Sequence, residues 1–473
     1  MSSLNPTTPR FKENVKDALA NQNIQSAMST AGGFAVGRAK ARAAMPEFDE
    51  IRDQARDLKN HVLANLADYL EQYEANVMAD GGHVHWAETA EDARRIVLDI
   101  CRKAGATAVN KGKTMISEEC GINEHLQEHG IKPVETDLGE YIIQMRGETP
   151  SHIIAPAIHV TLPEVEQLFN EQHTHLKPGR PMELETMLAE ARGVLRQKYF
   201  EAEVGITGAN MLIAETGQSV IVTNEGNGDL SQQLPKVHIV MASLEKIVPS
   251  LDDASTILRV LARSATGQES SVYTTFSAGP KRAGDPDGPE EYHVVLLDNG
   301  RTNMLGTEFQ EMLRCIRCGA CMNHCPVFKS VGGHAYGWVY PGPMGAVLTP
   351  SLIGIEQGRN LPNASTFCGR CEAVCPMRIP LPKMMRAYRA KEFEKGLTPG
   401  AARYALGAWK WIASRPALYR AVTGTLNRVL GLMGRWRGNF AWMPLASGWT
   451  DHRDLPAPPA GGSFQSQWQR SRK

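Results

Sequence analysis

The chain has 473 residues, and its 51 Lys and Arg side chains balance 51 Asp and Glu side chains. This length is enough for two or three folded units with a substantial core. The even charge argues against a general nucleic-acid-binding protein, because such proteins need a positive excess to displace counterions. The sequence contains no apolar core of signal-peptide length near its start and no uninterrupted apolar stretch of 18 residues. We therefore expect a cytoplasmic protein.

Residues 1–80 are predicted to be helical. The clearest helical pattern lies in the segment HVLANLADYLEQYEANV, where apolar side chains recur at intervals of three and four residues. These residues are Val62, Leu66, Tyr69, Leu70, Tyr73 and Val77. We interpret this segment as an amphipathic packing element.

Residues 81–305 change to short apolar strands that alternate with helices and Gly-rich turns, a pattern typical of an α/β domain. Thr89 and Asp92 form the Thr-x-x-Asp signature of a helix start. Strands are predicted at 219–223, 237–242 and 293–298. Two of the nine cysteines, Cys101 and Cys120, have no partner at ligand spacing, and we interpret both as small buried side chains.

The other seven cysteines lie within residues 306–395, in two related motifs. The first, CIRCGACMNHCP, contains Cys315, Cys318, Cys321 and Cys325. The second, CGRCEAVCP, contains Cys368, Cys371 and Cys375. Thiols in the reducing cytoplasm are better interpreted as metal ligands than as disulfides. Three cysteines at this spacing followed by a Cys-Pro pair are typical of segments that bind 4Fe-4S clusters.

In such segments the cysteine before the proline ligates the neighbouring cluster, so the two motifs should interlock. Cluster 1 would then take Cys315, Cys318, Cys321 and Cys375. Cluster 2 would take Cys325, Cys368 and Cys371 and lack a fourth cysteine. The residue at the position that would complete this pattern is Ser365. An iron at this place could bind Ser365, water, a group from a partner, or the hydroxyl and carboxylate of a substrate.

Zinc is the alternative occupant, because it also binds Cys-x-x-Cys pairs. The third cysteine at the same short spacing and the proline in both motifs favour iron–sulfur clusters. The long segment between the motifs, 326–367, favours a helical ferredoxin module over a small βαβ ferredoxin. Four cationic residues lie close to the cysteines and could hold an anion or offset the charge of the clusters: Arg314, Arg317, Lys329 and Arg370.

Several segments together resemble a known family over nearly the whole chain. They are GGHVHWA (81–87), ETDLGEYIIQM (135–145), PSHIIAPAIH (150–159), AETG (214–217), HVVLLDNGR (293–301), the cysteine motifs and WTDHRDLPAPP (449–459). These segments are similar to those of the lactate utilization protein B family. The resemblance implies an α/β domain similar to the ribose-phosphate isomerase and CoA-transferase group, followed by an all-helical ferredoxin module. It also implies that the seven cysteines bind two 4Fe-4S clusters.

For function, the resemblance implies a part in a three-protein, NAD-independent system that oxidises L-lactate to pyruvate. Lactate gives up two electrons and a cluster accepts one at a time, so paired clusters suit stepwise transfer to an acceptor such as a quinone or flavoprotein. Whether this chain performs the lactate chemistry or only relays electrons stays open. Two alternatives are a CoA-transferase-like enzyme with Glu225, in TNEGNG, as nucleophile, and a scaffold or iron sensor.

Residues 396–473 form a basic, Trp-rich segment with a Pro- and Gly-rich tail. Between Lys395 and Thr450 there is no Asp or Glu, whereas Arg and Trp side chains are interleaved. A surface at 396–450 of this kind is suited to an anionic membrane or to an acidic partner protein, and packing of the Trp side chains on the ferredoxin module is a further option. The tail, DLPAPPAGGSFQSQW, is predicted to be extended.

Overall fold

Six parallel strands form the main sheet of the protein, in the order β1-β10-β7-β4-β2-β3. The strands are β1 (His83–Ala87), β2 (Ala108–Lys111), β3 (Lys132–Glu135), β4 (Val204–Gly208), β7 (Val237–Ser243) and β10 (Glu291–Leu297). The predictions at 237–242 and 293–298 are confirmed by β7 and β10. β7 is buried along its whole length, as expected for a central parallel strand that helices cover on both faces.

A smaller sheet lies beside it in the order β8-β5-β6-β9. Its strands are β5 (Met211–Ile213), β6 (Gln218–Thr223), β8 (Ile247–Val248) and β9 (Tyr273–Ser277). The prediction at 219–223 is confirmed by β6. Because β6 ends at Thr223, the segment TNEGNG follows directly from a strand end, next to the start of α12 (Asn227–Gln233).

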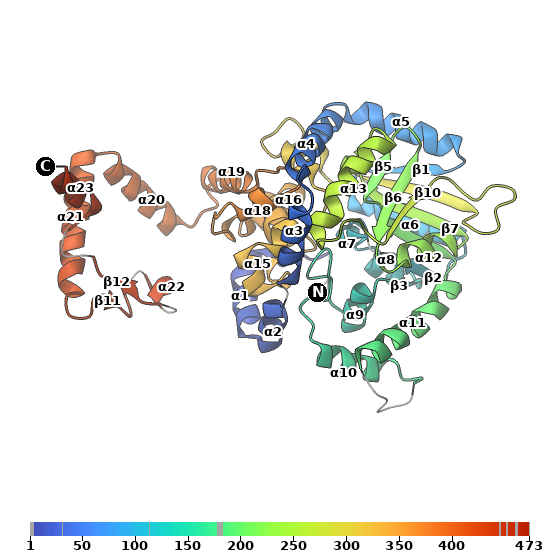
Figure 1. Ribbon diagram of the computed structural model, residues 1–473, viewed down its shortest axis with the longest axis horizontal. Helices are drawn as coiled ribbons and strands as arrows, with labels where there is room; N and C mark the ends of the chain where they lie inside the picture. The colour runs from blue at the N-terminus through green and yellow to red at the C-terminus, as the bar shows by residue number, and fades with distance from the viewer. Residues whose placement is uncertain are drawn as a thin grey trace. The chain divides into compact units, whose positions relative to one another are not determined.

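Helices cover both faces of the main sheet (Figure 1). The remaining helices of this α/β region are α6 (Ala90–Lys103), α7 (Met115–Cys120), α8 (Ile122–Glu128), α9 (Leu138–Arg146), α10 (Leu162–Gln172), α11 (Leu184–Glu201) and α13 (Leu251–Ala265). Thr89 and Asp92 form the capping box predicted for α6. Cys101 and Cys120 are buried in the core between these helices and the sheet, as expected.

The N-terminal residues are helical, as predicted, and contribute α1 (Phe11–Ala20), α2 (Gln22–Thr30), α3 (Gly33–Ala43), α4 (Phe48–Ala64) and α5 (Leu66–Ala79). The segment around Val62 is not one helix, because Asn65 separates α4 from α5 and donates its side-chain amide to the His61 carbonyl. The apolar face of α5 packs on the sheet. α4 also packs against α13, and α1 and α2 contact the helix that follows the first cysteine motif.

Residues 306–395 contain helices and turns and no strand, and the structure describes all of them. The α-helices are α14 (Ala320–Asn323), α15 (Pro326–Val331), α16 (Gly342–Ile353), α17 (Ile355–Gly358), α18 (Arg370–Val374) and α19 (Leu381–Glu394). Two very short helices, α14 and α18, each carry one cysteine of a motif, Cys321 and Cys371. The chain between them forms α15, α16 and α17, which accounts for the long spacing of the two motifs.

The C-terminal residues form a second unit, Glu392–Lys473, and the first unit comprises Met1–Lys391. The second unit contains α20 (Gly400–Ala413), α21 (Pro416–Met433), β11 (Asn439–Phe440), α22 (Ser447–Thr450), β12 (Leu455–Pro456) and α23 (Phe464–Ser471). The prediction of an extended tail is wrong for α23, because Ser463 caps a helix just beyond the last glycine. Residues 451, 452 and 459–461 of the family-like C-terminal segment and tail lie outside the described residues.

This computed structural model describes residues 4–30, 32–112, 114–176, 183–443, 446–450, 453–458 and 462–472. None of the helices in these ranges combines the length and apolar character that crossing a bilayer requires.

Candidate functional site

The two cysteine loops have matching backbone conformations. Arg317 precedes the second cysteine of the first loop with a φ of 59°, and Phe367 precedes Cys368 with a φ of 54°. Gly319 and Gly369, each directly after that cysteine, have φ values of 70° and 75°. A non-glycine residue at positive φ is strained, so its repetition indicates that both loops are built for the same purpose.

This match fixes the place of Ser365 in the second loop. Ser365 precedes Phe367 by two residues, as Cys315 precedes Arg317, so the serine stands where the first loop has its first cysteine. Its hydroxyl accepts a hydrogen bond from the Phe367 N–H at 3.1 Å.

Four cysteines from both motifs line one small cavity, and these are the four grouped as cluster 1: Cys315, Cys318, Cys321 and Cys375. The side chains are close enough to interact electrostatically, and Cys375 raises the pKa of Cys318 in addition to the larger effect of burial. Cys375 also accepts a hydrogen bond from the Ile379 N–H at its Sγ, at 3.5 Å. One cysteine of the second loop thus lies among three of the first.

The remaining three cysteines form the other group. Burial raises the pKa of Cys371 to about 12, and Cys325 and Cys368 raise it further. Cys325 comes from the first motif and the other two from the second, so the exchange between motifs is reciprocal. Cys368 is exposed, and the backbone N–H of Arg370 lowers its pKa.

The cysteines fit iron–sulfur clusters better than zinc. Four thiolates on one zinc ion, at Zn–S distances of about 2.3 Å, lie roughly 3.8 Å from one another. Among the described residues, which include all nine cysteines, no three cysteine sulfurs come within 4.8 Å of one another as such a site requires. A cluster spreads its ligands over several irons and needs this wider spacing. Burial raises the pKa of Cys318 to about 12, so iron binding there would release a proton.

Two buried arginines from the N-terminal helices hold the second loop. Arg52, on α4, donates to the carbonyl of Cys375 at 2.6 Å and to that of Ala373 at 2.9 Å. Arg38, on α3, donates to the Val374 carbonyl at 2.8 Å. Burial lowers the pKa of Arg38 to about 10, and the nearby Cys318 opposes this shift. These residues bring positive charge to a place where bound clusters would add negative charge.

The four cations noted beside the motifs differ in position. Arg314 is buried, and burial lowers its pKa against the opposing charges of Glu311 and Cys375. The Arg317 side chain is 9% exposed, and its pKa is raised because the charge of Cys315 and its other partners outweigh the effect of burial. Lys329 is half-buried and Arg370 is exposed.

A buried ionic network joins the first cysteine loop to the segments that follow β7 and β10. Arg301, which follows β10, pairs with Glu119 at 2.6 Å and with Glu245 at 3.1 Å. Glu245 in turn pairs with Arg317 at 3.1 Å. Tyr340 donates its hydroxyl to Glu119 at 2.5 Å, and Arg317 lies over the Tyr340 ring. The cysteine loop is therefore attached to the α/β region through charged hydrogen bonds, which are stronger than neutral ones.

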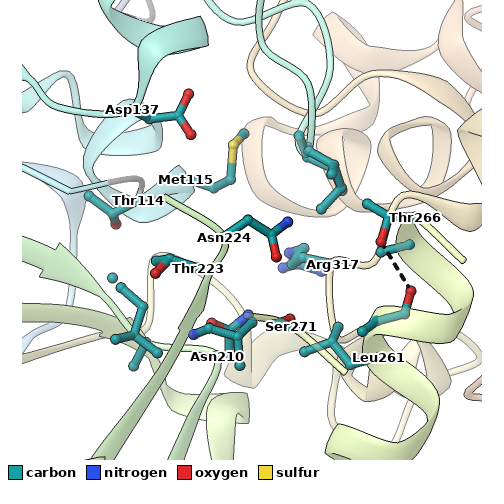
Figure 2. A pocket seen from close by; sticks show the side chains of 18 of the residues that line it. Thr114, Met115, Asp137, Asn210, Thr223, Asn224, Leu261, Thr266, Ser271 and Arg317 are labelled. Atoms are coloured by element: carbon teal, nitrogen blue, oxygen red, sulfur yellow. Dashed lines mark hydrogen bonds between the residues drawn. The ribbon is translucent and has the colours of Figure 1, made fainter. Parts of the chain in front are cut away.

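A cavity of about 180 Å³ lies beside this network (Figure 2). Gly208 at the end of β4, Thr114 after β2 and Lys246 after β7 line it from the sheet, and Arg317 lines it from the cysteine loop. Ligands of open α/β sheets characteristically bind at the carboxyl ends of the strands. Glu225 also lines this cavity, but its side chain belongs to an exposed residue.

A second group of possible metal ligands lies elsewhere. Glu148, His159 and His334 have ligand atoms within 4.8 Å of one another. His159 Nε2 is 2.8 Å from the Glu148 carboxylate, which also binds Arg146 at 2.9 Å. His334 donates to the Thr149 carbonyl at 2.6 Å. The arginine already neutralises this carboxylate, so we interpret the group as a hydrogen-bonded cluster.

Arg38, Arg52, Lys246 and the buried Tyr336 are not identified by motif analysis. The sequence does carry a signal for Arg52, because it lies on the same helical face as Phe48, Ile51 and Ala55. A cation on an apolar helix face needs a buried partner. This pattern does not identify the partner of Arg52, because the carbonyl of Cys375 is more than 300 residues away in the chain.

Comparison with known proteins gives three family models along the chain. Residues 70–297 match a LUD domain, residues 311–379 match a 4Fe-4S dicluster domain, and residues 371–473 match the C-terminal region of lactate utilisation protein B. The middle match covers all seven clustered cysteines. An iron–sulfur domain is thus supported independently of the loop geometry.

Similar proteins extend over almost the full chain. Lactate utilization protein B of Bacillus licheniformis is 42% identical over 95% of this chain and 94% of its own length. An uncharacterized electron transport protein of Escherichia coli, YkgF, is 40% identical over 97% of this chain and 95% of its own. The crystal structure of a DUF162 family protein from Deinococcus radiodurans covers 49% of this chain and 98% of its own, at 15% identity and a TM-score of 0.26.

Proposed function

This chain belongs to the lactate utilization protein B family, and from that membership we propose that it is the iron–sulfur electron-transfer subunit of an NAD-independent complex that oxidises L-lactate to pyruvate. The relatives' names refer to lactate utilization and to electron transport. The 4Fe-4S dicluster domain supports the presence of iron–sulfur clusters. The oxidation of lactate, the complex and the passage of electrons are our proposal.

The observation that carries the proposal is the exchange of cysteines between the two loops. We propose that Cys315, Cys318, Cys321 and Cys375 hold cluster 1, and that Cys325, Cys368 and Cys371 hold cluster 2. A bound 4Fe-4S cluster supplies reversible one-electron acceptance. Because each loop contributes to both groups, the chain holds the two sites next to each other, as stepwise transfer of two electrons requires.

The buried cations are proposed to set the charge balance of these sites. Arg38, Arg52, Arg314 and Arg317 approach the cysteines from three different parts of the chain. Positive charge beside a cluster favours its reduced form, which is the more negative one. Cys368 is exposed and Ser365 is half-buried, whereas most of the other clustered cysteines are buried. We therefore propose that cluster 2 faces the electron acceptor, with Ser365 at or beside the iron that lacks a cysteine ligand.

Partners are proposed to be the sister proteins of the lactate system and an acceptor such as a quinone or flavoprotein. The C-terminal unit is a suitable contact surface, because α20 and α21 bury none of their residues and expose apolar side chains next to basic ones. We propose that residues 396–450 make peripheral contact with an anionic membrane. The boundaries 81–305 and 306–395, and the grouping of the α/β domain with ribose-phosphate isomerases and CoA transferases, stay predictions.

The decisive experiment is anaerobic reconstitution of the purified chain with iron and sulfide, followed by addition of its sister proteins and L-lactate. Lactate-dependent reduction of the clusters, followed by EPR and visible absorbance, is the expected result. The Cys375→Ser variant should lose the cluster-1 signal although its substitution lies in the second motif. Cys101→Ser is the matched control and should keep both signals. A preparation that contains zinc in place of iron and acid-labile sulfide would refute the proposal.

A further inference from the structure

Several buried polar atoms without hydrogen-bond partners belong to residues that line the cavity in Figure 2. Among the described residues these are Arg317 Nη1, Thr223 Oγ1, and both Asn227 side-chain atoms. Buried polar groups are almost always paired, so a concentration of unpaired atoms in one place indicates that something else pairs with them. Asn227 is only 4% exposed, so bulk water does not satisfy its amide.

Lys246 adds a cation to the same cavity. Its side chain is buried and lines the cavity, and the negative charges nearest to it are those of Glu245 and Cys315. Burial lowers the pKa of Lys246 to about 8 and the charge of Arg317 lowers it further, whereas Glu245 opposes this shift. A buried ammonium is costly to keep charged, and an anion in the cavity would offset that cost.

Arg317 divides its guanidinium between the protein and the cavity. Nη2 binds the Glu245 carboxylate at 3.1 Å, while Nη1 has no hydrogen-bond partner among the residues that the structure describes. Cys315 and Cys318 lie two residues before and one residue after it, so the same backbone that carries two proposed cluster ligands also carries this donor. The positive φ of Arg317 shows that the loop accepts backbone strain at this position.

The walls of the cavity restrict the ligand. Asn210, Thr223 and Asn224 line the cavity with polar side chains, and the Asn224 amide is hydrogen-bonded to Gln268. Figure 2 shows Asn224 and Arg317 among the side chains around the cavity. Met241 and Leu261 offer apolar surface elsewhere on the wall. Two carboxylates also line the cavity, Glu225 and Asp137, and Asp137 accepts a hydrogen bond from the Glu140 N–H. The two cationic donors, the neutral hydrogen-bonding groups and the small apolar surface together suit a short organic acid.

We propose that this cavity binds a small monocarboxylate with a hydroxyl or keto group at C2, its carboxylate taken by Arg317 and Lys246 and its C2 oxygen by Thr223 and Asn227. The inference rests on the proposed function and adds to it a binding site for the organic acid. That place is beside the four-cysteine group and not at Ser365, which does not line the cavity.

The test uses the full chain with its clusters reconstituted anaerobically. Isothermal titration calorimetry with L-lactate, pyruvate, acetate and inorganic phosphate measures affinity and stoichiometry. L-lactate or pyruvate should bind once per chain, and acetate more weakly because it lacks the C2 oxygen. Lys246→Gln should weaken this binding at least tenfold. Lys236→Gln is the matched control, because Lys236 is exposed and precedes the opposite end of β7, and it should bind like the wild type.

A second variant keeps the test decisive if Lys246→Gln does not fold. Thr223→Val preserves the shape of the side chain and should weaken L-lactate or pyruvate several-fold while leaving acetate unchanged. Binding of none of these acids, tighter binding of phosphate than of any acid, or unchanged affinity in the folded variants would overturn the inference. Chemical reduction of the clusters by dithionite is measured in the same samples. Clusters that load and reduce without carboxylate binding would refute this inference alone, whereas a chain without clusters would refute the proposed function.

Discussion

Removing Arg52 should destabilise the second cysteine loop far more than removing Arg56, four residues later on the same helix. Arg52 is 2% exposed and donates three hydrogen bonds to the carbonyls of Ala373 and Cys375. Arg56 is partly exposed and pairs with the exposed side chains of Asp53 and Asp57. Methionine at either position keeps most of the length of the side chain and removes every donor.

The expected cost follows from these contacts. Each buried carbonyl that loses its donor costs about 1–3 kcal/mol, and part of this cost is offset because the buried guanidinium no longer has to be desolvated. Arg52→Met should therefore lower the free energy of unfolding by about 2–4 kcal/mol. Exposed ion pairs contribute little, so Arg56→Met should change it by roughly 0.5 kcal/mol or less.

Urea titration of the cluster-loaded chain measures this difference, with visible cluster absorbance and far-UV circular dichroism as two independent probes. The absorbance of Arg52→Met should disappear at a lower urea concentration than that of Arg56→Met. Arg52→Lys restores the charge but not the forked geometry, so it should recover less than half of the loss. Equal midpoints for the two methionine variants would show that the buried arginine does not hold the loop.

Four further predictions concern separate parts of the chain. Tyr336→Phe should lower the potential of a cluster by about 40 mV in an EPR redox titration. The buried hydroxyl lies near Cys321, Cys325 and Cys371 and has no hydrogen-bond partner among the described residues, so we expect it to donate to a bound cluster with a bond worth about 1 kcal/mol that favours the reduced form; an unchanged potential would exclude that contact. Ser365→Cys should make cluster 2 more resistant to oxygen and should remove any spectral response of that cluster to added ligand. The rate at which the variant loses iron in air measures the first effect, and it should be slower than in the wild type. Burial lowers the pKa of His238 to about 3, so as the pH falls from 6.5 to 3 the unfolded state binds a proton that the folded state does not. The free energy of unfolding should therefore decrease by up to about 1.4 kcal/mol for each unit by which the pH falls. In acid denaturation a His238→Gln variant should lose less of its stability over the same pH range. Trp436, at 92% exposure, should contribute to membrane contact, so Trp436→Ser should reduce co-sedimentation with anionic vesicles several-fold, and equal sedimentation with neutral vesicles would contradict an electrostatic surface.

Local patterns were sufficient for much of the fold. The three predicted strands and the capped start of α6 are confirmed, because each depends on side-chain periodicity or on a cap within a few residues. The burial of Cys101 and Cys120 follows in the same way from the absence of a partner at ligand spacing. The break at Asn65 was not predicted, because the apolar spacing continues across it. The helix α23 was not predicted, because it directly follows a Pro- and Gly-rich run that is typical of extended chain.

The sequence by itself predicted iron–sulfur chemistry for the cysteine region, and the match to a 4Fe-4S dicluster domain supports it. The spacing of the seven cysteines and the prolines after Cys325 and Cys375 points to clusters and to an exchange of ligands between motifs. This information is local, because a cluster-binding loop is only a few residues long and its geometry is fixed by the backbone between its cysteines. The position of Ser365 follows from the same spacing, and the matching backbone angles of the two loops support it.

Only the tertiary structure decided what surrounds these loops. Arg38 and Arg52 approach from the N-terminal helices, Arg301 from the end of β10, and Lys246 from the end of β7. Arg38 and Arg52 lie more than 300 residues before the loop that they contact. Nothing in the local pattern of any of the four cations names its partner. Burial is what makes their charges matter, because an unpaired charge costs little in water and much in a protein interior. Burial is a property of the assembled fold, and it is therefore the fold that places the candidate carboxylate site beside the first cysteine loop.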